Sequence, residues 1–158
     1  GFLYAGLMID ADGNPSVIEY NCRFGDPETQ PIMHRLQSDL AAWCLAARDH
    51  PLDQHTAQWD PRPAVGVVLA AGGYPGSYEK GFAISGLDSD WGLSTKVFHA
   101  GTRQEDDTIT TQGGRVLCVS ALGDSIRDAI DAAYRGVDQI SWKDMVVRRD
   151  IGWRAIDR

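Results

Sequence analysis

The residues best suited to chemistry lie close together in the segment 19–23. Side chains alternate along a β-strand, so a strand here would place Glu19, Asn21 and Arg23 on one face. Carboxylate and amide oxygens suit a hard cation such as Mg²⁺ (or Mn²⁺), and an adjacent guanidinium can contact a phosphate. A cation beside an arginine is what phosphoryl transfer needs, because that chemistry depends on positioning and charge neutralisation. The spacing alone also fits a solvated polar face of an antiparallel hairpin.

The composition indicates a folded protein and argues against two kinds of partner. The chain has 158 residues, of which 43% are hydrophobic and 23% charged, enough for one ordinary domain or two small units. The net charge of −7 argues against nucleic acid, and no apolar run is long enough to cross a membrane. The first residue is Gly1 rather than Met, so we expect a piece of a larger protein.

The cysteines and the distribution of charge refine this picture. Cys22, Cys44 and Cys118 have neither CxxC nor metal-site spacing, which indicates buried free thiols in a reducing compartment and therefore a cytoplasmic location. Residues 1–60 hold three basic and nine acidic side chains, whereas residues 61–158 hold twelve and thirteen. The acidic first part suits a divalent cation, and the balanced second part could hold a phosphate.

The first part of the chain predicts a hairpin followed by one helix. Strands are expected at 3–9 and 17–24, joined by a turn at 12–15 whose Asp-Gly-Asn-Pro sequence tolerates positive φ. Residues 18, 20, 22 and 24 would then face a core. A single helix is expected from Pro31 to Arg48, and residues 49–63, which contain three prolines, read as a linker.

The second part predicts a small mixed domain. Strands are expected at 65–71, 96–99, 108–111 and 115–122, with a glycine-rich turn at 72–76 and a hairpin turn at 112–114. Asp124 or Ser125 can cap a helix with an apolar stripe. The tail from 145 to 156 combines a short strand with a basic cluster.

The segment from Arg23 to Met33, Arg-Phe-Gly-Asp-Pro-Glu-Thr-Gln-Pro-Ile-Met, closely resembles the signature of the glycinamide ribonucleotide synthetase family. Similar stretches occur at 4–8, 70–75, 96–102, 114–117 and 148–153, in the order of that family's C-terminal end. The resemblance implies an α+β fold in two parts. Residues 1–60 would be the C-terminal part of an ATP-grasp domain, a β-hairpin plus helix, and residues 61–158 a small mixed α/β C-terminal domain.

The resemblance also implies a function. Members of the family ligate glycine to 5-phosphoribosylamine through a glycyl phosphate, using ATP and Mg²⁺ (or Mn²⁺). Glu19 and Asn21 would hold the metal, and Arg23 would lie near the reacting phosphate. Many relatives add a metal carboxylate on the preceding strand, but residues 3–7 contain no acid. The remaining N-terminal domains of the same enzyme would be required, so the chain alone is expected to be inactive.

The substrate residues remain open at this stage. Asp26 could cap the segment that follows it, or Asp26 and Glu28 could bind the glycine ammonium. Gly72 and Gly73 could let a ligand approach the backbone, or could simply form a tight turn. His99, at the end of a predicted strand, is expected to be structural.

Arg148 and Arg149 are candidates for binding the ribose 5′-phosphate, although an exposed arginine pair is often just solvated surface. If they continue a strand, only one of them points into the cleft. Asp150 would share a face with Arg148 and pair with it, which favours Arg149 as the phosphate ligand. Lys80 and the backbone at 72–73 are the fallback site.

Two rival functions remain. The chain could be a non-catalytic piece retained for packing or binding. It could also belong to another ATP-grasp carboxylate–amine ligase, although the Gly-Asp-Pro-Glu sequence at 25–28 argues against this.

Overall fold

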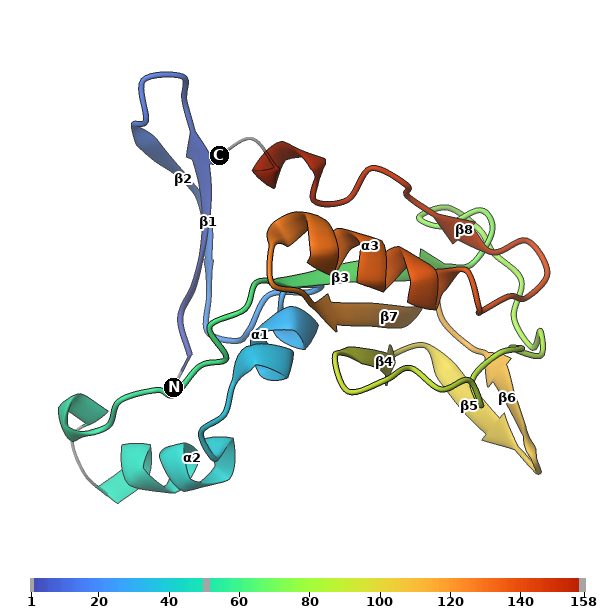
Figure 1. Cartoon of the computed structure of the whole chain (residues 1–158), viewed down its shortest axis with the longest axis horizontal. Coiled ribbons are helices and arrows are strands. Elements are labelled where there is room, and N and C mark those ends of the chain that lie inside the picture. The colour runs from blue at the N-terminus through green and yellow to red at the C-terminus, as the bar shows by residue number, and fades with distance from the viewer. Residues whose placement is uncertain (1, 50–51, 157–158) are drawn as a thin grey trace.

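The computed structural model describes residues 2–49 and 52–156. Strands β1 (Tyr4–Ile9) and β2 (Pro15–Asn21) form an antiparallel hairpin that stands away from the rest of the molecule (Figure 1). At its turn the Asp10 carboxylate accepts hydrogen bonds from the backbone N–H groups of Asp12 and Asn14 at 2.9 and 2.8 Å, and Gly13 has φ +87°. The predicted hairpin and its turn are confirmed.

Strand β2 is shorter at its end than predicted. It stops at Asn21, which pairs with Tyr4, the first residue of β1. Phe24 instead stacks on Phe2, with ring centroids 4.1 Å apart. The expectation that the alternate residues 18, 20, 22 and 24 face a core is also wrong for Ile18 and Tyr20, which are 64% and 62% exposed.

The single predicted helix is in fact two, α1 (Thr29–Arg35) and α2 (Leu40–Asp49). Leu36 turns to an extended conformation and bridges Trp59, and the Gln37 N–H donates to the Gln58 carbonyl at 2.9 Å. The Asp39 carboxylate then accepts from the backbone N–H groups at positions 41 and 42, as a helix N-cap does. Local capping and tertiary pairing therefore override the continuous helical period. The predicted linker contains a short 3₁₀ turn, η1 (Leu52–Gln54).

The second region is built on a four-stranded antiparallel sheet in the order β4-β7-β3-β8. Its strands are β3 (Ala64–Ala70), β4 (Thr95–His99), β7 (Arg115–Leu122) and β8 (Val146–Val147). A separate hairpin pairs β5 (Thr102–Glu105) with β6 (Thr108–Thr111).

The hairpin turn predicted at 112–114 is wrong. Strand β6 pairs with β5 rather than with β7, and the chain turns near Asp106, which has φ +52°. At 112–114 the chain passes from one sheet to the other, and the N–H groups of Gln112 and Gly113 donate to the Gly101 carbonyl at 2.7 and 3.0 Å.

Helix α3 (Ile126–Val137) covers one face of the sheet and closes the core. Ser125 caps its N-terminus in a capping box with Asp128, which confirms the expected start. The apolar stripe of the helix packs on the inward side chains of β3 and β7. The fully buried side chains include Val67, Leu69, Val116, Val119, Ala129, Ala133 and Val137.

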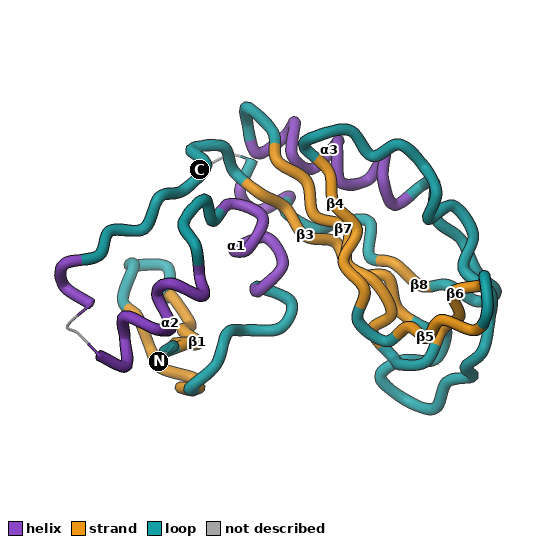
Figure 2. The backbone as a smooth tube through the Cα atoms, turned by 90° about the horizontal axis from the view of Figure 1, so that it is seen from below, coloured by secondary structure: helices purple, strands orange, loops and turns teal. Residues whose placement is uncertain are grey.

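Helix α1 lies on the opposite face of the sheet (Figure 2). Gly66 makes this close approach possible, because a Cβ there would lie 3.2 Å from the Pro31 ring and 3.4 Å from the Cys118 sulfur. The chain ends in a 3₁₀ turn, η2 (Trp153–Ala155). The α+β fold class is confirmed. Within residues 2–49 and 52–156, the helices are too short and too polar to cross a membrane.

Candidate active site

The oxygen ligands predicted from the sequence do come together at the base of the hairpin. The register places Tyr4 opposite Asn21 and Gly6 opposite Glu19, so these side chains share one face. The Tyr4 hydroxyl contacts the Glu28 carboxylate at 3.4 Å. A second carboxylate therefore approaches this face from the loop that follows β2.

The charged side chains nearby change the pKa of the Tyr4 hydroxyl. The negative charge of Glu28 raises the pKa of Tyr4 above its ordinary value, with smaller contributions from burial, the hydrogen bond to Glu28 and the charge of Glu19. Arg23 opposes this effect. Sequence reasoning missed Tyr4. The available signal was its place opposite Asn21 in a hairpin whose turn was already predicted.

This set of side chains fits a hard cation in part. Glu19, Asn21 and Glu28 offer oxygen. The Nδ2 atom of Asn21 is buried without a hydrogen-bond partner among the described residues, but an amide nitrogen donates hydrogen bonds, so only the Oδ1 atom of Asn21 could bind a cation. Across the described ranges, no three His, Cys, Asp or Glu side chains form a metal-binding group. A Mg²⁺ ion here would complete its coordination with water and nucleotide phosphates, which is its usual behaviour.

Arg23 lies just beyond the strand rather than within it. Its guanidinium Nη1 donates to the neighbouring Phe24 carbonyl at 2.9 Å, and the side chain is exposed. The inference that strand alternation aligns Arg23 with Glu19 is therefore wrong, because the ladder ends at Asn21. Arg23 is nevertheless close enough to influence Tyr4 electrostatically.

The loop between β2 and α1, residues 22–28, carries the start of the family signature and is called the signature loop below. Arg115, which sequence reasoning also missed, ties this loop to the second region. Its Nη1 atom donates to both the carbonyl and the carboxylate Oδ1 of Asp26, each at 2.9 Å. Its Nε atom donates to the Tyr74 hydroxyl at 2.9 Å. Asp26 does not cap the helix that follows, whose N-cap residue is Glu28 and has no side-chain cap bond. The Gly-Gly-Arg sequence after a predicted turn was the only local hint.

A pocket of about 410 Å³ opens beside this contact, on the sheet face opposite α3. It brings together side chains that are far apart in the sequence. Two of them, Arg115 and Arg148, are cationic, and the floor is the outer row of β3. The lining residues are Pro27, Gly66, Val68, Ala70, Tyr74, Arg115, Val146, Arg148 and Ile151.

The two tail arginines point to different places. Arg148 lines the pocket and pairs with Asp150 at 2.6 Å, so that predicted ion pair is confirmed. Arg149 pairs with Asp138 at the end of α3, also at 2.6 Å, and lies near the Tyr134 ring. The preference for Arg149 over Arg148 considered only acids two residues away on the same strand face, and it does not hold because Asp138 reaches Arg149 from another element.

Gly72 and Gly73 are explained by packing within the chain. Gly73 has φ +94°, and an added Cβ would collide with the Ser77 carbonyl. A Cβ on Gly72 would lie 2.5 Å from the Asp144 carbonyl. This geometry favours the tight-turn interpretation.

The two remaining candidates, His99 and Lys80, have local partners. The ring of His99 contacts Thr102 at 3.1 Å, in keeping with a structural role. The ammonium of Lys80 lies 5.9 Å from the centre of the Tyr78 ring.

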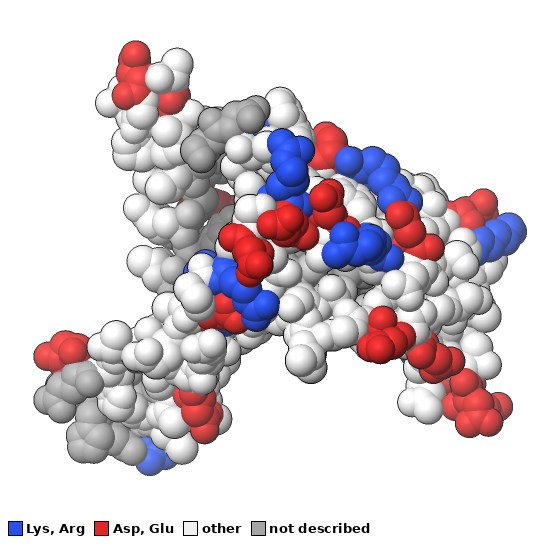
Figure 3. Space-filling view, in the orientation of Figure 1, with Lys and Arg blue, Asp and Glu red and all other residues white. Residues whose placement is uncertain are grey.

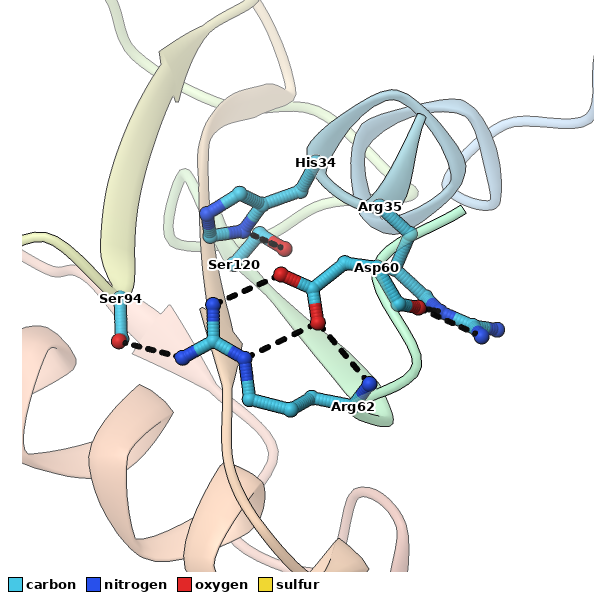
Figure 4. Close-up of polar contacts among 6 residues, drawn as sticks. All are labelled: His34, Arg35, Asp60, Arg62, Ser94 and Ser120. Carbon is cyan, nitrogen blue, oxygen red and sulfur yellow. Dashed lines mark hydrogen bonds and ion pairs between the residues drawn. The ribbon is translucent and has the colours of Figure 1, made fainter. Parts of the chain in front are cut away.

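Polar contacts join α1 and the segment after α2 to the sheet (Figure 4). His34 Nδ1 and the buried Ser120 hydroxyl are 3.0 Å apart, and burial is the main cause that lowers the pKa of His34. Asp60 pairs with Arg62 at 2.8 Å. Hydrogen bonds from Arg62 lower the pKa of Asp60 to about 2. The Asp60 carbonyl accepts from Arg35. These contacts hold α1 against the sheet and so place the signature loop.

Comparison with known proteins agrees with this arrangement. The sequence model described as phosphoribosylglycinamide synthetase, C domain, matches residues 64–154, and that of the ATP-grasp (A) domain matches residues 1–29. The chain is 64% identical over its full length to the phosphoribosylamine–glycine ligase of Allochromatium vinosum, and 58% identical to that of Escherichia coli. It spans 37% of the length of each of these relatives.

Solved structures show the same fold. The crystal structure of phosphoribosylamine–glycine ligase from Thermotoga maritima matches 95% of this chain and 36% of its own, with a TM-score of 0.79 and 35% identity. The biotin carboxylase domain of a thermophilic 2-oxoglutarate carboxylase matches 89% of this chain and 32% of its own, with a TM-score of 0.64 at 17% identity, which shows a shared fold alone. By its sequence and its fold, the chain belongs to the phosphoribosylglycinamide synthetase family.

Proposed function

We propose that the full-length enzyme containing this sequence ligates glycine to 5-phosphoribosylamine at the expense of ATP. The observation that carries this proposal is the meeting of two carboxylates at the base of the hairpin, where Glu28 contacts the Tyr4 hydroxyl at 3.4 Å and the strand register places Glu19 on the same face. Relatives that match the whole chain are named phosphoribosylamine–glycine ligases, which supports the same reaction. The three cysteines are free thiols, in keeping with a proposed cytoplasmic location. Only Cys118 is buried, so the expected burial is wrong for Cys22 and Cys44.

The proposed reaction has two transfers. The glycine carboxylate attacks the γ-phosphorus of ATP, and ADP leaves with the electrons of the broken bond. The amine of phosphoribosylamine then attacks the carbonyl carbon of glycyl phosphate. Inorganic phosphate departs and the amine loses a proton, which yields glycinamide ribonucleotide.

The residues of this chain would serve the first transfer by holding charge in place. Glu19 and Asn21 would hold Mg²⁺ (or Mn²⁺), which neutralises charge on the nucleotide phosphates when bound. Arg23 would offer a guanidinium to the transferring phosphoryl group. Asp26 and Glu28 would bind the glycine ammonium, since both are exposed carboxylates in the signature loop.

For the ribose 5′-phosphate we propose the pocket lined by Arg148 and Arg115. Arginine's planar fork matches phosphate oxygens, and two guanidiniums in one cavity supply the charge that the phosphate requires. Both tail arginines hold an ion pair, but Arg148 lines this pocket while paired with Asp150, whereas Arg149 pairs with Asp138 and does not line it. Gly72 and Gly73 are not included, because the chain's own carbonyls fill the space next to them.

The matched pair Arg148→Ala and Arg149→Ala tests the phosphate site in the full-length enzyme. A charge-assisted contact is worth roughly 1.5–3 kcal/mol, so Arg148→Ala should raise the KM for phosphoribosylamine about tenfold to a hundredfold. The KM for ATP should hardly change in either variant. A large effect from Arg149→Ala with none from Arg148→Ala would move the phosphate to the other side of the tail.

The reaction itself is tested with the unmodified full-length enzyme. ADP release should require both glycine and phosphoribosylamine, and the product should contain the glycyl amide. ADP release with another carboxylate in place of glycine, and none with glycine, would favour a different ATP-grasp ligase. The 158-residue chain alone should be inactive, because a misplacement of about 1 Å already costs roughly a hundredfold in rate.

A further inference from the structure

The side chain of Arg115 contacts the signature loop and also lines the pocket proposed for the phosphate. Its Nη1 atom is committed to Asp26 and its Nε atom to Tyr74. Its Nη2 atom has no hydrogen-bond partner among the described residues, and the side chain lines the pocket that also contains Arg148. One guanidinium therefore touches the signature loop while it borders the proposed phosphate pocket.

Tyr74 contacts the Arg115 guanidinium through both its hydroxyl and its ring. Its hydroxyl accepts from Arg115, and its ring centre lies 5.9 Å from the guanidinium carbon. The ring packs edge-on against Tyr78, with centroids 6.3 Å apart. It also lies so close to Gly114 that a Cβ on that residue would be 2.7 Å from the Tyr74 Cε2 atom.

On the other side, Arg115 grips Asp26 at two points. The same Nη1 atom reaches the backbone carbonyl and the carboxylate Oδ1, so both the loop and the side-chain rotamer are held. The Asp26 side chain is nevertheless 66% exposed, and its Oδ2 atom has no partner in the described part of the chain. One carboxylate oxygen is thus anchored and the other is open to a ligand.

We propose that Arg115, held by Tyr74, is a positioning residue that orients the Asp26 carboxylate toward the ammonium group of glycine. This rests on the proposed function and extends it. A simple exposed ion pair contributes little, but a side chain anchored at two sites reduces the freedom that substrate binding would otherwise have to remove. The same side chain also borders the pocket proposed for the phosphate of the second substrate.

The test is a double-mutant cycle in the full-length enzyme with glycine as the varied substrate. Arg115→Ala and Asp26→Asn should each raise the KM for glycine roughly tenfold to a hundredfold, because misplacement of a contact group has costs of this size. The KM for glycine of the double variant should be no higher than that of the more impaired single variant, since Arg115 acts through Asp26. Tyr74→Phe should give a smaller rise, and Arg115→Lys should not restore the wild-type value, because lysine lacks the fork.

The control is Arg103→Ala, which removes another exposed arginine from the same region, one paired with Glu105 at 3.9 Å. It should leave every KM unchanged. Melting temperatures of all variants separate positioning from folding, because a purely structural role for Arg115 would lower Tm and leave the KM for glycine alone. That outcome, or single-variant effects that multiply in the double variant, would overturn the proposal. An unmodified enzyme that shows no glycine-dependent ADP release would instead refute the proposed function.

Discussion

The hairpin β1–β2 and the sheet β4-β7-β3-β8 have equally regular backbones, but they bury their apolar side chains very differently. In the hairpin, Leu7 is 46% exposed, and Ile18 and Tyr20 are exposed further. In the sheet, Val67 and Val119 are fully buried beneath α3. The second region therefore has a core of its own, whereas the hairpin displays an apolar surface that is characteristic of an interface.

The surface charge follows the same division. In the view of Figure 3, acidic and basic side chains are interspersed over α3, while most of the hairpin stem is uncharged and its tip is acidic. The exposed large apolar side chains are concentrated on the hairpin, and the chain spans 37% of the length of its relatives. The residues proposed for the metal thus lie on the region with the least packing of its own.

The largest expected effect tests whether the hairpin contributes to catalysis rather than to the stability of the fold. In the full-length enzyme, Glu19→Ala should reduce kcat/KM by roughly a thousandfold or more, because metal-assisted charge stabilisation is worth several kcal/mol. Its melting temperature should not change, since Glu19 is exposed. The control Glu105→Ala removes an exposed acid from the second region and should keep full activity. Near-normal activity of Glu19→Ala at limiting Mg²⁺ would remove the metal assignment.

The second prediction compares one leucine from each region in the 158-residue chain. Leu69→Ala should lower the free energy of unfolding by about 2–5 kcal/mol, because it opens a cavity in the closed core. Leu7→Ala should change it by less than about 0.5 kcal/mol, because Leu7 is largely exposed here. Urea denaturation measures both. Equal losses would mean that the hairpin is packed into the same cooperative core.

The third prediction concerns the joint between the regions. Gly66→Val should lower stability by about 1–3 kcal/mol, since its side chain would push Pro31 and Cys118 apart. Gly66→Ala should be milder, because its Cβ needs a shift of only a few tenths of an ångström. Thermal unfolding of both variants checks this order. A stabilising valine would show that α1 can move off the sheet at no cost.

The smallest expected effect is a pH dependence at the same joint. Burial, together with the charges of Lys96 and Arg62, lowers the folded-state pKa of His34 below its ordinary value near 6.5. As the pH falls through that ordinary value, the unfolded chain takes up a proton that the folded chain resists, so His34 makes stability fall toward acid pH. His34→Gln should remove this component, a matter of a few degrees in Tm between pH 7 and 5. An identical pH profile for both proteins would contradict it.

Local features of the fold were predictable because local residues cause them. The turn near Gly13 and the start of α3 at Ser125 depend on side chains that bond to neighbouring backbone, and both are confirmed. The uninterrupted helix from Pro31 to Arg48 was not a sound prediction, because Leu36 is drawn out by pairing with Trp59, more than twenty positions away. The pairing of β7 with both β3 and β4, in place of β6, depends in the same way on distant segments.

The sequence by itself determined the family, the oxygen pair Glu19 and Asn21, and the signature loop, because these are properties of residue type and short spacing. Only the tertiary structure decided that Tyr4 lies among the carboxylates and that Arg115 reaches Asp26 across 89 positions. It also decided that Asp138 captures Arg149 and leaves Arg148 in the pocket. The physical reason is that a side chain's partner is set by which elements pack together, and packing joins residues whose separation along the chain carries no signal.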